Sequence, residues 1–78
     1  MKDIPAVIKE FLALPDADGF SIYDKFAYLI KSVDGDSYYF YTQLVEDEFI
    51  SEELGYQVYK AISNNITPKD VLNWYKLV

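Results

Sequence analysis

The sequence predicts an all-α fold, a compact bundle of four to five short helices. Apolar residues recur at helical spacing in five segments, and Ser or Thr stands at the start of several of them. Short runs of Asp with Gly or Pro separate the first three segments. A chain of 78 residues forms one hydrophobic core, so we expect a single helical domain over residues 1–78.

The first predicted helix follows Asp3, a candidate N-cap residue. Its apolar residues are Ile4, Val7, Ile8, Phe11 and Leu14. The segment Pro15-Asp16-Ala17-Asp18-Gly19 breaks the helix. Aligning Gly19 with the glycine of a calcium-binding EF-hand loop puts Leu14 and Lys25 at ligand positions. Neither side chain binds calcium, so the segment is predicted to be an interhelical loop.

Ser21 caps the second predicted helix, and Asp24 completes an acidic variant of the capping box. The apolar stripe of this helix is Ile22, Phe26, Leu29, Ile30 and Val33. Asp34-Gly35-Asp36 ends it. The same Asp-Gly pair is also a hairpin signal, which leaves an α+β alternative with strands at 28–33 and 38–44. These runs lack strict alternation, so the helical interpretation is preferred.

The third predicted helix spans roughly Ser37–Phe49 and is apolar around most of its circumference. We therefore expect a central, largely buried helix. A helical wheel places Tyr38, Tyr41, Val45 and Phe49 on one side. Glu48 falls next to these residues, where a partly buried carboxylate would pair with a lysine or a tyrosine hydroxyl.

Two further helices complete the bundle. Ser51 caps the fourth, whose stripe is Leu54, Val58, Ala61 and Ile62, and Asn64-Asn65 is expected to end it. Thr67-Pro68-Lys69-Asp70 is a strong start signal for the fifth helix. Val71, Trp74, Tyr75 and Val78 are expected to pack this helix onto the others.

The composition argues against several classes of chemistry. The chain has no Cys and no His, which removes the usual metal ligands and general bases. We therefore expect no catalytic residues, no metal and no cofactor, and a protein that is not an enzyme. The net charge is −6 and every cation is a lysine, which disfavours direct nucleic-acid binding. With no apolar run long enough to span a membrane and no signal peptide, a cytoplasmic location is expected.

The segment Gly35-Asp36-Ser37, which opens an acidic helix, resembles the modification site of acyl carrier proteins. In that family an Asp-Ser-Leu motif carries phosphopantetheine on its serine, so the resemblance implies Ser37 as the attachment site. Two departures weaken it, because Tyr38 replaces the leucine and a regular helix precedes the motif where the family has a long loop. An acyl-carrier-like domain is kept as one alternative function. A small helical DNA-binding regulator is the other, although Glu52 and Glu53 would face phosphate badly.

The eight tyrosines exceed what the core of so small a domain needs. Several aromatic residues fall on the polar arcs of their helices, among carboxylates and amides. Tyrosine combines a large contact area with a hydroxyl and is enriched at interaction hot spots. The residues predicted to bind a partner are Tyr28, Tyr39, Phe40, Gln43, Glu46, Asp47, Glu53 and Tyr56. Closure of a second side of the core, or a homodimer, is the alternative use of these aromatics.

The function expected from these features is a small acidic protein-binding module that inhibits or regulates a protein with a basic surface. Carboxylates around exposed aromatics steer such a domain toward a basic partner. A phage or mobile-element inhibitor, or an immunity-type bacterial protein, fits this description.

Overall fold

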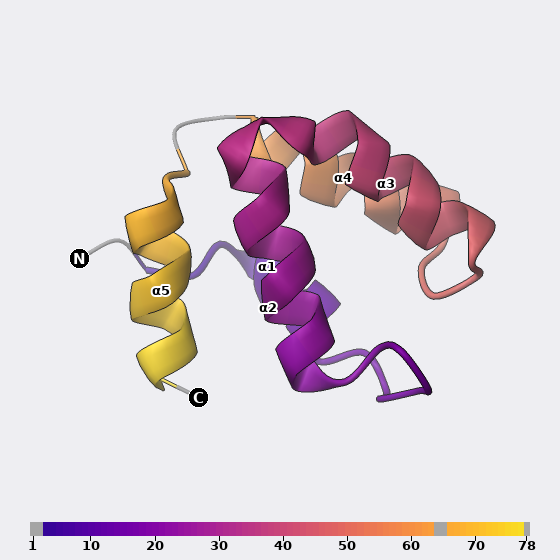
Figure 1. The fold of residues 1–78 in the computed structure, drawn as a ribbon, viewed down its shortest axis with the longest axis horizontal. Coiled ribbons are helices and arrows are strands. Elements are labelled where there is room, and N and C mark those ends of the chain that lie inside the picture. The colour runs from indigo at the N-terminus through magenta and orange to yellow at the C-terminus, as the bar shows by residue number, and fades with distance from the viewer. Residues whose placement is uncertain (1–2, 64–65, 78) are drawn as a thin grey trace.

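The computed structural model describes residues 3–63 and 66–77 (Figure 1). These residues form an all-α globule, as the sequence predicts. The helices are α1 (Ala6–Leu12), α2 (Ile22–Lys31), α3 (Ser37–Glu46), α4 (Glu52–Ile62) and α5 (Pro68–Leu77). A five-residue junction, η1 (Ser32–Asp36), joins α2 to α3 and contains a kink at Gly35. The predicted stop at Asn64-Asn65 and the predicted core residue Val78 lie outside the described residues.

The predicted caps set the starts of three helices. At α2 the Ser21 hydroxyl accepts the Asp24 backbone N–H at 3.2 Å, and the Asp24 carboxylate accepts the Ser21 N–H at 2.8 Å. At α5 the same reciprocal pair joins Thr67 and Asp70, at 3.2 and 2.9 Å. Ser51 caps α4 in the simpler way, accepting one backbone N–H of the first turn at 3.2 Å. Each cap satisfies N–H groups that the helix itself leaves unpaired.

The prediction that α1 begins after Asp3 is wrong. The helix begins at Ala6, and its N-cap is Pro5, which makes no side-chain capping bond. A residue that precedes proline is disfavoured in the α conformation, so Ile4 stays outside the helix. Pro5 itself has an extended ψ of 148°, and its carbonyl accepts the Lys9 N–H at 3.0 Å.

The junction between α2 and α3 is helical on both sides, so the alternative hairpin around Asp34-Gly35-Asp36 does not form. Gly35 has a φ of 126°, which a residue with a side chain rarely adopts. This residue interrupts the helical backbone and turns the chain. Consequently α3 runs across the end of α2 instead of continuing it (Figure 1).

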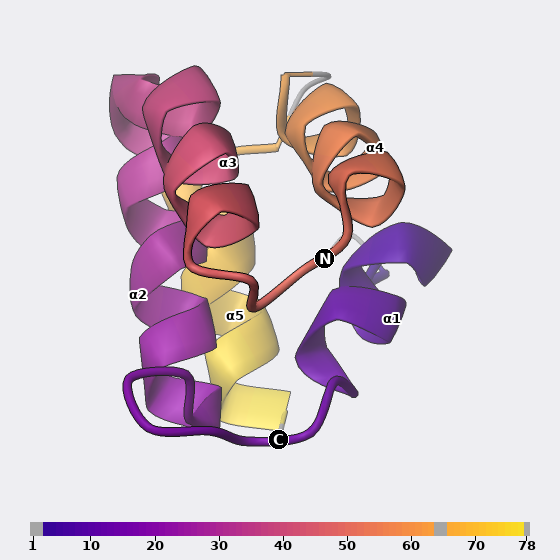
Figure 2. The ribbon, with the colours of Figure 1, turned by 90° about the vertical axis from the view of Figure 1, so that its right-hand side faces the viewer.

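The helices pack around one core, with α3 beside α4, α4 against α1, and α5 against α2 (Figure 2). Its buried apolar residues are Ile8, Phe11, Phe20, Phe26, Leu29, Leu44, Ile50, Leu54, Val58, Ile62, Val71 and Trp74. They come from every helix and from the two loops that flank α2 and α4. Most of the stripes that the sequence predicts for α2, α4 and α5 therefore point inward.

The third helix is not the central, largely buried element that its composition predicts. Leu44 is its one buried residue, and Tyr38 is 63% exposed. Phe49 lies beyond the helix, which ends at Glu46. Because α3 packs mainly on a single neighbour, α4, two of its four aromatic residues stay exposed and the other two are only half-buried. Aromatic content therefore overestimates how deeply this helix is buried.

The contact between α3 and α4 is closest at Gly55. A Cβ atom at this position would lie 3.0 Å from the Cδ1 of Tyr41 and 3.0 Å from the Cγ2 of Val45. The missing side chain thus lets the two helices approach each other.

A buried lysine joins α2 to the loop that precedes it. Lys25 is completely buried, although it lies on the polar arc of the predicted helix. Its ammonium donates hydrogen bonds to the Leu14 carbonyl and, at 2.9 Å, to the Asp16 carboxylate. It also lies 5.0 Å from the centre of the Phe20 ring, which stacks on Phe49 at 4.7 Å. These contacts compensate the cost of removing the charge from water.

The end of α3 is a Schellman motif. The N–H of Phe49 donates to the Leu44 carbonyl and the N–H of Glu48 to the Val45 carbonyl, both at 3.1 Å. Glu48 has a φ of 62° and is exposed, so it is not the partly buried carboxylate that the sequence predicts. Its role is to reverse the chain in the left-handed conformation, which glycine adopts more easily.

Glu48→Gly should stabilise the protein, because glycine adopts a positive φ without steric strain. We expect the free energy of unfolding to rise by about 1 kcal/mol and Tm by roughly 4–8 °C. Glu48→Ala is the matched control, since it removes the same charge and keeps the Cβ atom. Thermal unfolding followed by circular dichroism measures both. Equal stabilisation by Gly and Ala would show that the charge, and not the backbone, is responsible.

Gly55→Val should destabilise the protein by forcing α3 away from α4. Overpacking of this kind costs about 1–3 kcal/mol. Gln57→Val places the same side chain at an exposed position of the same helix and should change stability by only a few tenths of a kcal/mol. Urea unfolding of the two variants compares them, and similar losses would contradict the close approach at Gly55.

Candidate functional site

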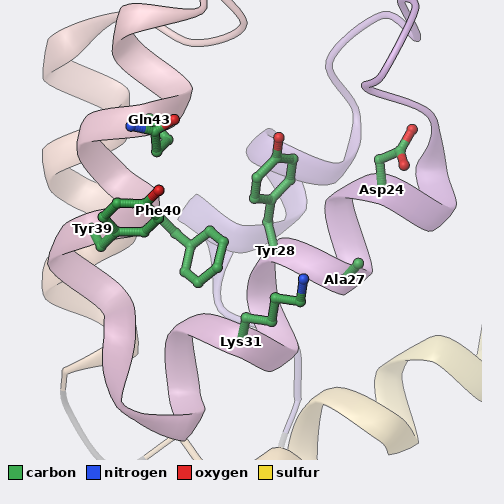
Figure 3. Close-up of a pocket in the computed structure, with 7 residues that line it drawn as sticks. All are labelled: Asp24, Ala27, Tyr28, Lys31, Tyr39, Phe40 and Gln43. Carbon is green, nitrogen blue, oxygen red and sulfur yellow. The ribbon is translucent and has the colours of Figure 1, made fainter.

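A groove of about 330 Å³ separates the exposed faces of α2 and α3 (Figure 3). Its lining residues are Asp24, Ala27, Tyr28, Lys31, Tyr39, Phe40 and Gln43. The four residues from α2 follow helical spacing, and the turn at Gly35 brings the three from α3 opposite them. We call this feature the α2–α3 groove.

Aromatic rings form the walls of the α2–α3 groove. Phe40 meets Tyr28 edge to face with ring centres 5.7 Å apart, and it meets Tyr39 at 5.4 Å. The Lys31 ammonium lies 5.9 Å from the centre of the Phe40 ring. Tyr39 is 57% exposed at the edge of the groove, whereas Tyr28 and Phe40 are half-buried. The groove thus has fixed aromatic walls and one ring that is open to a partner.

Carboxylates lie close to the groove. Burial raises the pKa of Tyr28 above its ordinary value, and the nearby charges of Asp47 and Asp24 raise it further. Asp24 is held ionised, because hydrogen bonds from the Ser21 N–H and hydroxyl lower its pKa. The neutral phenol is therefore the stable form of Tyr28, in a negative local potential.

The structure divides the predicted partner-binding residues between two surfaces. Tyr28, Tyr39, Phe40 and Gln43 line the α2–α3 groove, and Asp47 is near enough to influence Tyr28. Glu46 is exposed at the end of α3 and does not line the α2–α3 groove. Glu53 and Tyr56 belong to a different surface, formed by α3 with α4.

That second surface contains a cluster of four tyrosines. The cluster consists of Tyr38, Tyr41, Tyr56 and Tyr59. Tyr41 stacks on Tyr59 with ring centres 5.6 Å apart and meets Tyr56 at 6.2 Å and 82°. Tyr38 meets both Tyr41 and Tyr59 edge to face. The helical wheel places Tyr38 and Tyr41 on one side of the third predicted helix, and the sequence pattern does not single out Tyr59. The sequence signal that could identify this cluster is the spacing of three residues between two tyrosines in each helix, Tyr38 and Tyr41 in α3 and Tyr56 and Tyr59 in α4.

A third surface, an apolar groove of about 350 Å³ between α2 and α5, was not predicted. Tyr23 and Leu72 are exposed beside it, at 68% and 53%. Tyr75, which the sequence assigns to the core, is also exposed, although its ring contacts Phe26 at 5.2 Å. The amphipathic pattern of α5 does not reveal this groove. The pattern shows which residues of α5 are apolar, but not that α2 leaves some of them uncovered.

Ser37, the residue implied by the resemblance to acyl carrier proteins, is half-buried at the first position of α3. It lines a small, partly open hollow of about 10 Å³ together with Tyr41 and Leu44. A regular helix, α2, precedes it, as the sequence predicts. The half-buried position of Ser37 and the regular helix before it do not favour attachment of a prosthetic group.

Within residues 3–63 and 66–77, no three acidic side chains gather in an arrangement that could hold a metal ion. Over the same ranges no helix is long and apolar enough to cross a bilayer. The chain matches no protein-family model, no curated protein and no solved structure.

The raised pKa values of Tyr28 and Tyr41 predict an alkaline loss of stability. Because the folded-state pKa lies above the unfolded value, the contribution is complete below about pH 10 and is lost as pH rises through the folded-state pKa. The double variant Tyr28→Phe with Tyr41→Phe should therefore lose less stability than the unmodified protein as pH rises above about 10. Urea unfolding across this range measures the difference. Parallel pH profiles of the two proteins would contradict the prediction.

Proposed function

We propose that this chain is a non-enzymatic protein-binding module that inhibits or regulates a partner with a basic surface. The observation that carries the proposal is the α2–α3 groove, whose aromatic walls and carboxylate neighbours come from residues on the polar arcs of two helices. The ring of Tyr39 is exposed and does not contribute to the core. Contact with another molecule would explain why a large aromatic side chain lies at this position.

The walls of the groove suit contact with a protein. Tyrosine and phenylalanine rings offer large contact areas and lose little conformational entropy when a partner covers them. Phe40 is already fixed by Tyr28 and Lys31, so a partner side chain would enter a largely preformed site. Asp24, Lys31 and Gln43 supply polar atoms that would fix its orientation.

The negative charge of the chain supports the proposal that the partner is basic. The net charge of the chain is −6, and Asp24 and Asp47 both lie near Tyr28. A negative field accelerates association with a positively charged surface and disfavours nucleic acid as the direct ligand. An inhibitor that covers the basic groove of a nucleic-acid-binding or nuclease-type protein fits these properties. Such inhibitors include phage or mobile-element proteins and immunity-type proteins.

The test compares two matched baits in capture experiments from the source organism. Tyr39→Ala with Asp47→Lys alters the groove, whereas Tyr23→Ala with Glu10→Lys makes the same chemical changes elsewhere on the surface. We expect the unmodified chain and the Tyr23/Glu10 variant to capture the same basic protein. With that protein purified, the Tyr39/Asp47 variant should bind about 30-fold more weakly or worse, since truncating a hot-spot residue costs about 2 kcal/mol or more.

Calorimetry on the purified pair gives the affinities, and circular dichroism confirms that both variants fold. Equal binding by the two variants would exclude the α2–α3 groove as the contact surface. Capture of an acidic protein would contradict the proposed partner chemistry.

A further inference from the structure

The tyrosine cluster contains a corner in which two aromatic rings stand nearly at right angles. Tyr41 from α3 and Tyr56 from α4 form its two walls, with ring centres 6.2 Å apart and planes 82° apart. Glu52, Glu53 and Gln57 complete the lining of this open hollow. We call it the tyrosine corner. It lies on α3 and α4, whereas the groove of the proposed function lies between α2 and α3.

We propose that the tyrosine corner binds an arginine side chain of another protein. The proposal rests on the proposed function in one respect only, namely that a basic partner supplies the arginine. A cation is attracted to the face of an aromatic ring, and two rings at a right angle can contact one cation from two sides. The carboxylates beside the rings add the opposite charge.

The electrostatics of the corner favour a cation. Its lining contains two carboxylates and no lysine, and within the described residues neither Glu52 nor Glu53 forms an ion pair. The charge of Glu52 is close enough to Tyr41 to contribute to its raised pKa, after burial of the phenol. The corner is therefore a negative site that the described part of the chain does not neutralise.

The chain uses the same chemistry internally. The ammonium of Lys25 lies 5.0 Å from the Phe20 ring centre, and that of Lys31 lies 5.9 Å from the Phe40 ring centre. In the tyrosine corner the rings are present and the cation is not supplied by a lining residue. The 78 residues of the sequence contain no arginine, so none of them can supply the arginine that the corner would bind.

Geometry selects arginine over lysine as the occupant. A guanidinium is planar, stacks on an aromatic face and can donate two parallel hydrogen bonds to one carboxylate. An ammonium is a compact, strongly hydrated charge that can do neither. A corner of two rings with a carboxylate beside them offers both interactions to a single guanidinium.

The test uses a short blocked arginine peptide, with a citrulline peptide of the same length as its neutral isostere and a lysine peptide for comparison. Aromatic-ring NMR signals of the folded chain are followed during each titration. We expect the arginine peptide to shift the ring signals of Tyr41 and Tyr56 in a saturable way, the lysine peptide to bind more weakly, and the citrulline peptide to have no effect. Equal shifts with citrulline would overturn the proposal.

Three variants assign the interaction to the corner. Tyr56→Leu keeps an apolar side chain without a ring and should weaken binding about fivefold, the equivalent of one cation–π contact of about 1 kcal/mol. Tyr56→Phe keeps the ring and should bind like the unmodified chain. Glu52→Gln should also weaken binding, whereas Glu10→Gln, which removes an equal charge from α1, should not.

Equal weakening by Glu52→Gln and Glu10→Gln would mean that the peptide senses only the net charge, and it would overturn the site. The two proposals fail separately. Loss of peptide binding in Tyr56→Leu together with normal partner binding by the Tyr39/Asp47 variant would retain the tyrosine corner and reject the α2–α3 groove. The reverse pattern would retain the groove and reject the corner.

Discussion

At Gly55, α4 comes so close to α3 that a Cβ atom would meet Tyr41 and Val45 at 3.0 Å, and both candidate surfaces depend on this contact. It fixes the position of α3, which has only one buried residue of its own to hold it. One side of α3 then faces α2 and forms a wall of the α2–α3 groove. The other side joins α4 and supplies Tyr41 to the tyrosine corner. A single glycine thus places aromatic residues on two faces of one helix.

Local signals in the sequence were enough to predict the architecture. The caps at Ser21, Ser51 and Thr67 depend on residues within one helical turn, so sequence spacing contains all the information that they need. Lys25 could not be placed in this way. Its burial depends on a carbonyl and a carboxylate eleven and nine residues before it, which the loop brings back over α2. Glu48 was misplaced because a helical wheel continues past the point where the backbone turns left-handed.

The surfaces were predicted in part for a related reason. Tyr28, Tyr39 and Phe40 fall on polar arcs, and a helical wheel is sufficient to show that such residues face outward. Tyr41 and Tyr59 fall on apolar arcs, where a wheel cannot distinguish a core residue from one at the margin of a two-helix contact. That distinction depends on how many neighbours α3 has. The number of neighbours is a property of the tertiary arrangement, and no window of the sequence contains it.

The complete burial of Lys25 gives the chain a chemical reporter of its own motion. Lys9, Lys31, Lys60, Lys69 and Lys76 are all exposed, so an amine-reactive reagent can modify them in the folded state. It can reach the Lys25 amine only when the loop over α2 opens or the whole domain unfolds. The acylation rate at this one position, compared with the rate of global unfolding, therefore measures how often the loop opens by itself. Mass spectrometry of the native protein can follow that motion without a label being introduced.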